Sequence, residues 1–268
     1  MAITEVHVAH PPAESKGKLK GRPWITYTAV VAAALVLWHL LSLVVNPLFL
    51  PSPLRVGAAT AELISSGEML QHVSASYGRV LSGWIIGAAF AIPLGLLAGR
   101  VTLLRVALEP FLNFFRFIPP IAFLSLALIW LGIGETSKVA LIVYASFFIV
   151  FLSAVAGVQG VDKEKIHAAQ CLGASRRQVI TTVVMPAAVP EIVTGLRTAM
   201  GIAFMTVVAA ELVAAESGIG FLIYNSRLFA RTDIVFAGIL ALGVMGLTAD
   251  ILFRQLTRPI HYRYALRF

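Results

Sequence analysis

Charged residues are sparse along this chain, and the intervals between them form long apolar stretches. Six intervals contain no Asp, Glu, Lys or Arg between their bounding charged residues, namely 22–55, 79–100, 116–135, 138–162, 197–211 and 233–250. A helix needs about 20 residues to cross the hydrocarbon core of a bilayer. Continuous apolar runs also lack the alternation of barrel strands. The pattern therefore predicts an all-α membrane protein with six transmembrane helices.

The fifth interval is short for a transmembrane helix, and Arg197 and Glu211 bound it. These two charges are expected to reach opposite interfaces, or else to face protein or a water-filled cavity. We place Glu211 at the external end of this helix and predict that protein or water, not lipid, surrounds it. Two roles stay open for Glu211: it holds the external loop, or it belongs to a gate.

Composition supports a membrane location. Hydrophobic residues make up 59% of the 268 residues, charged residues make up 13%, and the mean hydropathy is +0.88, which excludes an ordinary water-exposed surface. With both termini on one side of six spans, 15 Lys and Arg residues fall on that side. Five fall on the other side, namely Arg55, Arg79, Lys138, Arg227 and Arg231. The positive-inside rule then predicts cytoplasmic termini, and the same bias accounts for the pI near 10.0 without a nucleic-acid partner.

Four segments are expected from these patterns. Residues 1–22 form a basic cytoplasmic tail, and residues 23–68 hold the first transmembrane helix and an external loop with a short helix over 54–65. Residues 69–255 form the core, with transmembrane helices 2–6 and a cytoplasmic loop at 159–186, and residues 256–268 form a second basic tail. In the second transmembrane helix a small residue recurs at every fourth position, at Gly83, Gly87, Ala91, Gly95 and Gly99. This stripe predicts close packing against another helix, or alternatively a surface that slides during gating.

The cytoplasmic loop is polar and predicts two short helices. Asp162 is a suitable N-cap for the first helix, and Gly173 ends it. Ser175 and Gln178 form a capping box for the second helix, whose apolar side continues to Pro186. One face of the first helix is expected to carry Lys165, Ala168, Ala169 and Leu172. Such a loop could lie on the membrane surface, but its small-residue face favours the groove of a partner protein.

Motifs for catalysis are missing from the sequence. The chain contains no G-x-x-x-x-G-K-[ST] phosphate loop, no H-E-x-x-H and no G-x-S-x-G. Its six histidines are scattered, and Cys171 is its one cysteine. We therefore expect no enzyme activity, no metal site and no cofactor in this chain, and we expect that it does not bind ATP itself.

The cytoplasmic loop matches a known signature, E-A-A, three residues, Gly, nine residues and then I-x-L-P. Here His167, Ala168 and Ala169 precede Gly173, and the segment 183–186 closes the motif at the same spacing. The chain resembles the permease subunits of bacterial binding-protein-dependent ABC importers, with His167 in place of Glu. The segments LPSP, GIGETSK, AAQCLGAS, TGLR, VAAEL, SGIGFLIYNSR and TD are similar to the branch for taurine, alkanesulfonates, nitrate or bicarbonate.

The resemblance implies the type I ABC importer permease fold in the bacterial inner membrane. It implies a homodimer of this chain, two cytoplasmic ATPase subunits that bind ATP and Mg, and a periplasmic or lipid-anchored solute-binding protein. ATP binding would close the ATPases, and the cytoplasmic loop would transmit this closure to the pathway. The residues placed at the ATPase contact are Asp162, Lys165, His167, Ala168, Ala169, Leu172, Gly173, Arg176, Arg177 and Pro186. For Arg176 and Arg177, anionic lipid headgroups are an alternative partner.

The substrate class expected from this branch is a small anion, such as a sulfonate, nitrate or bicarbonate. Ser146, Thr198 and Thr206 are candidate hydroxyl donors along an anion path without a buried arginine, and helix packing is the alternative role for all three. A second function stays open, an ion-coupled carrier that works without an ATPase and uses Glu211 as its coupling carboxylate.

Overall fold

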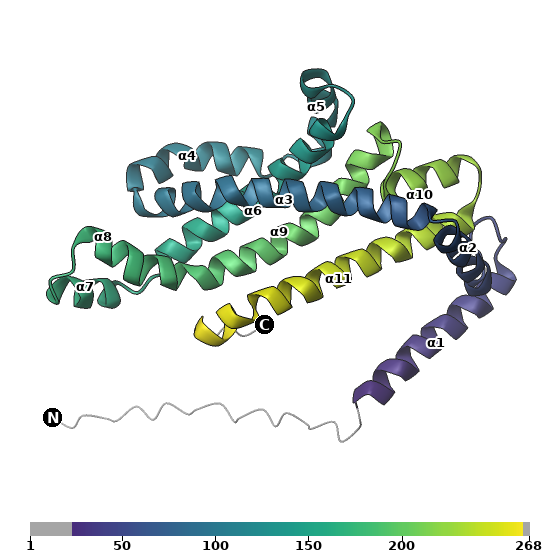
Figure 1. Ribbon diagram of the computed structural model, residues 1–268, viewed down its shortest axis with the longest axis horizontal. Coiled ribbons are helices and arrows are strands. Elements are labelled where there is room, and N and C mark those ends of the chain that lie inside the picture. The colour runs from purple at the N-terminus through teal and green to yellow at the C-terminus, as the bar shows by residue number, and fades with distance from the viewer. Residues whose placement is uncertain (1–22, 265–268) are drawn as a thin grey trace, which may run out of the picture.

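The computed structural model describes residues 23–264, and every regular element within that range is a helix. In chain order the elements are α1 (Pro23–Val44), α2 (Pro53–Ser65), α3 (Glu68–Arg100), α4 (Thr102–Phe115), η1 (Pro120–Phe123), α5 (Leu124–Leu131), α6 (Glu135–Gln159), α7 (Lys163–Cys171), α8 (Arg176–Gln178), η2 (Val179–Val184), α9 (Met185–Ala214), α10 (Ile219–Leu228) and α11 (Thr232–Tyr264). Figure 1 shows long helices running lengthwise, with α7 and α8 at one end, here called the α7 end, and α2 and α10 toward the other, the α10 end.

Five helical stretches of the described residues are long and apolar enough to cross a membrane, and one bent pair of helices adds a sixth. The five stretches are Ile25–Val44, Glu68–Arg100, Glu135–Gln159, Arg176–Val213 and Thr232–Ile260, and the bent pair joins Thr102–Phe115 to Pro120–Leu131. The predicted all-α membrane architecture is confirmed, with six spans when the bent pair counts as one.

The prediction of a single helix over 116–135 is wrong. The structure has α4 before this interval and α5 inside it, and the two parts of the bent pair meet at 88°. Pro119 and Pro120 lie at the break, where proline lacks the N–H that a continuing helix needs. The charge pattern concealed α4 because Arg105 and Glu109 interrupt its apolar sequence.

The fifth span is longer than its charge-free interval. The sequence pattern predicts a helix over 197–211 and a separate helix that ends at Pro186. The structure instead joins α8, η2 and α9 into one continuous helical stretch. Pro186 lies in the first turn of α9, directly after the π-helical residues of η2. The wider π turn makes room for the proline ring, and the hydrogen bond that a proline N–H would donate is not needed there. The helix therefore continues through the proline. Arg197 therefore lies in the interior of a span.

The small-residue stripe of α3 packs against α6. A methyl group added to Gly83, Gly87, Gly95 or Gly99 would come within 2.6–3.0 Å of an atom of α6. Glycine permits this approach of the two backbones, which confirms the predicted close packing. Behind this pair, α6 packs on α9, and α9 packs on α11.

Helix α1 stands apart from the bundle along most of its length. Only 6% of its apolar window is buried, and Figure 1 shows its first turns directed away from the other helices. Near its end, Trp38 stacks on Phe236 of α11, with 5.7 Å between ring centroids, and donates its ring N–H to the Pro51 carbonyl at 3.1 Å. The short helix expected over 54–65 is present as α2, which packs on α11.

The last helix continues past the expected end of the core. Helix α11 reaches Tyr264, so the boundary between residues 255 and 256 falls inside a helix. The basic tail at residues 1–22 lies outside the described residues, as do residues 265–268.

Candidate translocation and coupling sites

Two short helical segments with defined caps form the α7 end. Asp162 begins α7 by accepting a hydrogen bond from the backbone N–H of Glu164 at 2.9 Å. Gly173 follows α7 with φ of +80°, the left-handed conformation that glycine adopts freely. The backbone N–H of Ser175 donates to the Gln178 side chain at 2.8 Å, and the Gln178 N–H donates to the Ser175 hydroxyl at 3.3 Å. The predicted caps and the glycine turn are confirmed.

Helix α7 folds back on η2, and its two alanines differ in exposure as a result. Ala169 is half-buried and packs, with Ile166, against a cluster that includes Val179. Ala168 is exposed, and Leu172 is 89% exposed. The predicted face of Lys165, Ala168, Ala169 and Leu172 is therefore partly covered, because η2 packs against its Ala169 edge. Of the other residues expected at the ATPase contact, Lys165, His167, Arg176 and Arg177 are exposed and Pro186 is half-buried.

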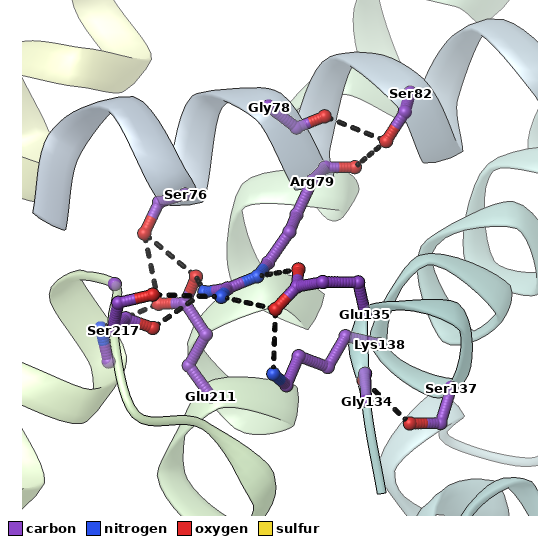
Figure 2. A network of polar contacts seen from close by, with 12 residues as sticks. Ser76, Gly78, Arg79, Ser82, Gly134, Glu135, Ser137, Lys138, Glu211 and Ser217 are labelled. Atoms are coloured by element: carbon purple, nitrogen blue, oxygen red, sulfur yellow. Dashed lines mark hydrogen bonds and ion pairs between the residues drawn. The ribbon is translucent and has the colours of Figure 1, made fainter. Parts of the chain in front are cut away.

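A network of charges, buried except for Glu135, occupies the α10 end (Figure 2). The Arg79 guanidinium of α3 donates to both carboxylate oxygens of Glu135 at 2.6 and 2.7 Å, to Glu211 of α9 at 2.6 Å and to the Ser217 carbonyl at 2.6 Å. Lys138 adds a second cation, 3.0 Å from Glu135. Two cations and two carboxylates thus neutralise each other where α3, α6 and α9 meet.

The same network holds the first turn of α10. Backbone N–H groups at the start of a helix lack partners within the helix. Here the N–H groups of residues 218–220 donate in order to His72 Nδ1 at 3.0 Å, Ser76 Oγ at 2.9 Å and Glu211 Oε2 at 2.8 Å. A carboxylate at this position also interacts favourably with the positive end of the helix dipole. Glu211 therefore fixes α10 against both α3 and α9.

Protein surrounds Glu211, as one of the two predicted environments requires, and the side chain is 0% exposed. Sequence reasoning missed its partner Arg79, which it placed at an external interface together with Lys138. Both residues are only 4% exposed, so they add nothing to the interfacial charge. Of the five cations counted on the predicted external side, three remain. No local signal marked Arg79, because it follows the polar first part of α3 and therefore has the sequence pattern of an interfacial residue.

A second charged cluster lies in the interior of two spans and faces a cavity. Arg197 of α9 donates to both carboxylate oxygens of Asp250 of α11 at 2.6 and 3.1 Å, and Arg254 binds the same carboxylate. The side chains of Arg197 and Asp250 are 31% and 27% exposed. They line a cavity of about 530 Å³ together with Thr194, Thr198, Met200, Gly201, Phe204, Met205, Leu242 and Gly246.

The three candidate hydroxyls have different surroundings. Thr198 is exposed and lines this cavity. Thr206 is buried and donates to the Ile202 carbonyl at 2.9 Å. Ser146 is buried against Gly87 of α3, and its hydroxyl has no hydrogen-bond partner among the described residues. The anion path expected from the sequence contained no buried arginine, whereas the cavity that Thr198 lines is also lined by Arg197.

A sequence model described as "Binding-protein-dependent transport system inner membrane component" matches residues 91–262, more than half of the chain. The chain belongs to this family. As a permease of a binding-protein-dependent ABC importer, it is a transport subunit and not the ATPase, and the family implies a separate ATPase and a binding protein as partners. The family implies no cofactor site.

Relatives place the permease in a narrower group. It is 40% identical over 237 residues to the taurine transport system permease protein TauC of Escherichia coli K12, covering 86% of both chains. It is 34% identical to the putative aliphatic sulfonates transport permease protein SsuC of Bacillus subtilis, covering 92% of both chains. It is 33% identical to the nitrate import permease protein NrtB of a Synechocystis species, covering 82% of this chain and 83% of the relative. The predicted family resemblance is confirmed.

The fold agrees with a solved ABC importer. A chain of the MetNI methionine ABC transporter, solved in inward-facing conformations, matches with a TM-score of 0.57 at 17% identity. The match covers 69% of the permease and 94% of that chain. At this identity the similarity concerns the fold, and the predicted importer permease fold is confirmed.

Proposed function

We propose that the permease imports a small anionic solute, a sulfonate such as taurine or an alkanesulfonate, or alternatively nitrate or bicarbonate. The observation that carries the proposal is Arg197, a cation in the interior of a span that faces a cavity. A charged side chain in this position is costly in contact with lipid and typically lines a substrate path. The similarity to TauC over 86% of both chains favours a sulfonate.

The chemistry of the cavity suits an anion. Arg197 and Arg254 together carry one more charge than Asp250 neutralises, so the cluster is positive overall. Thr194 and Thr198 add hydroxyl groups that can donate to sulfonate or nitrate oxygens. A cavity of about 530 Å³ also falls within the usual size of small-molecule sites, about 300–1,000 Å³.

A second copy of the chain is part of the proposal. The cavity opens on the surface of a single chain between α9 and α11, and its half-exposed ion pair needs water or protein, not lipid, on its open side. A homodimer with two such faces opposed would enclose a common path. The exposed length of α1 provides a further apolar surface for the second copy.

The α7 end is proposed as the cytoplasmic contact with the ATPase, which places both termini in the cytoplasm. Leu172 presents an apolar side chain at 89% exposure beside the exposed Ala168 and His167. An ATPase that binds this surface more tightly in one of its two states shifts the conformational equilibrium of the permease by the difference in binding free energy.

Uptake of labelled taurine into proteoliposomes tests the proposal, with the permease, its ATPase and its binding protein reconstituted together. Arg197→Gln should lower uptake by about tenfold or more, because a hydrogen bond to a charged group contributes roughly 1.5–3 kcal/mol. Arg254→Gln is the comparison variant: it lowers the charge of the cluster by the same amount but leaves Arg197 at the cavity wall, so its loss of uptake should be smaller. Equal loss in both variants, or no loss in Arg197→Gln, would contradict the assignment of the cavity.

The alternative of an ion-coupled carrier gives a different result in the same assay. A carrier transports with the permease alone when a proton or sodium gradient is applied. The proposed importer takes up nothing without ATPase, ATP and binding protein, whatever the gradient. Glu211 also lies among ion pairs and helix-capping hydrogen bonds, away from the residues that line the cavity.

A further inference from the structure

A second cavity lies between α3, α4 and α6, none of which lines the cavity of Arg197. It measures about 370 Å³ and shares no lining residue with the cavity of Arg197. Four polar side chains line it, Arg105, Glu109 and Asn113 from α4 and Gln159 from the end of α6. Its apolar lining is Ala98, Leu112, Phe151, Leu152 and Val155.

Among the described residues, the polar side chains of this cavity have no ion-pair or side-chain hydrogen-bond partner. Arg105 and Glu109 are one helical turn apart, a spacing at which opposite charges commonly pair. Within residues 23–264, however, neither of them forms an ion pair, and no side-chain hydrogen bond joins Asn113 or Gln159 to another residue. Arg105 is half-buried, whereas Glu109, Asn113 and Gln159 are exposed, and a partly desolvated cation without a counter-charge is costly. The cavity therefore presents one cation, one anion and two amides to a ligand.

The surroundings of the cavity are apolar and exposed. Leu103, Val106, Phe111 and Phe114 on the outer faces of α4 are 81%, 58%, 63% and 65% exposed. Exposed aromatic and aliphatic side chains on a helix of a membrane protein are suited to acyl chains. The polar cavity and this apolar surface belong to the same short helix, so a ligand that contacts both is amphipathic.

We propose that this cavity binds one phospholipid with a phosphoethanolamine headgroup. The phosphate would accept hydrogen bonds from Arg105, and the primary ammonium would donate to Glu109, so both unpaired charges gain a partner. Asn113 and Gln159 can bind the ester and phosphate oxygens. A phosphatidylglycerol headgroup offers no cation to Glu109, and a phosphatidylcholine headgroup offers no N–H donor. Free phosphate satisfies Arg105 alone and leaves the apolar surface of α4 without a ligand.

Native mass spectrometry of the purified permease–ATPase complex tests this proposal independently of transport. Dioleoyl phosphatidylethanolamine, phosphatidylglycerol and phosphatidylcholine are added in turn at equal concentration. We expect one tightly retained phosphatidylethanolamine per permease, with at least several-fold lower retention of the other two lipids. Equal retention of all three lipids would overturn the proposal.

Variants assign the binding to the cavity. Arg105→Gln should lower retention of phosphatidylethanolamine by about tenfold, because it removes a charge-assisted hydrogen bond. Glu109→Gln should retain lipid but lose the preference for phosphatidylethanolamine over phosphatidylglycerol. Arg100→Gln is the matched control, an exposed arginine at the end of α3 that does not line the cavity, and its retention should equal that of the unaltered chain.

Two further results would overturn the proposal. One is an equal loss of retention in Arg100→Gln and Arg105→Gln, which indicates general attraction of basic residues for lipid. The other is displacement of the retained lipid by millimolar inorganic phosphate, which indicates that the site takes a free anion. All substitutions lie at half-buried or exposed positions, so the variants are expected to assemble, and thermal unfolding in detergent verifies this.

Discussion

Arg79 and Glu211 form an ion pair across the α10 end of the bundle, with 2.6 Å between Nη1 and Oε1. Their positions in the network differ. Among the described residues Arg79 is the one cation paired with Glu211, whose side chain is 0% exposed, whereas Arg79 also binds Glu135. Loss of Arg79 therefore leaves a buried carboxylate without a counter-charge, while loss of Glu211 leaves Arg79 with an anionic partner.

We expect Arg79→Gln to destabilise the permease more than Glu211→Gln does. Removal of one member of a buried ion pair costs about 3–5 kcal/mol when the remaining charge stays uncompensated. Thermal unfolding of each purified variant in detergent measures the difference, and Arg55→Gln, at an exposed arginine of α2, serves as the control. Equal destabilisation by the two substitutions would contradict this account of the network.

Glu211→Gln itself should fold and assemble but slow uptake. Glutamine can still accept the hydrogen bond from the Gly220 N–H. It lacks the negative charge that stabilises the N-terminus of α10 and pairs with Arg79. Taurine uptake at saturating ATP and binding protein measures the effect. Unchanged uptake would remove Glu211 from any gate and leave it a purely structural role.

Gly218 has no room for a side chain. Its φ is +115°, and an added methyl group would lie 2.3 Å from the Glu211 Cδ atom. Gly218→Ala should therefore displace the Glu211 carboxylate and, from the backbone strain alone, cost about 1–3 kcal/mol. Gly57→Ala is the control, because that glycine lies inside α2 with nothing within 4 Å of the added methyl group. A melting temperature as high in Gly218→Ala as in Gly57→Ala would show that the close approach is unimportant.

Part of the fold follows from the spacing of charges, because a charge inside lipid is expensive and marks some helix ends, such as Arg100 at the end of α3 and Asp233 at the start of α11. This reasoning failed where a charge has a partner inside the bundle. Arg79 reads as the boundary of a helix, yet Glu135 and Glu211 keep it within α3. Such partners are 56 and 132 residues away in sequence, so the pattern around Arg79 does not reveal them.

The candidate sites also contain features that the local sequence predicts and features that depend on tertiary contacts. Local signals placed the caps at Asp162 and Ser175 and the turn at Gly173, since each depends on neighbours a few residues away. The inward orientation of Ala169 depends on how α7 folds onto η2, and the pairing of Arg197 with Asp250 depends on how α9 packs on α11. Both are tertiary contacts, which a single sequence does not encode in its local pattern.

Arg176 and Arg177 are expected to bind the ATPase. Both lie at the start of a helix, where cations oppose the dipole by about 0.3–1 kcal/mol, so helix stability does not explain them. Replacing both with Gln should weaken co-purification of the ATPase in detergent. If the ATPase is retained and membrane insertion is impaired instead, the two arginines bind anionic headgroups, and the predicted contact is wrong.

Gly173 provides the sharpest test of the α7 end, because its strain is purely conformational. Its φ is +80°, and nothing lies within 4 Å of an added methyl group, so a larger side chain would meet no clash. Left-handed backbone costs most residues about 1–2 kcal/mol, β-branched residues are worst, and Asn tolerates it. Gly173→Val should therefore misdirect the turn between α7 and α8, while Gly173→Asn should preserve it. Insertion and assembly of the spans should persist in both variants, since no span depends on this turn.

The two variants should then differ in coupling. With Gly173→Val, we expect weak co-purification of the ATPase and little ATP hydrolysis stimulated by loaded binding protein in nanodiscs, because the exposed face of Ala168 and Leu172 is misplaced. With Gly173→Asn, both measurements should stay near those of the unaltered permease. Normal hydrolysis in the valine variant would mean that residues 159–186 are a surface connector. Equal loss in both variants would mean that the side chain itself, not the backbone conformation, blocks the contact with the ATPase.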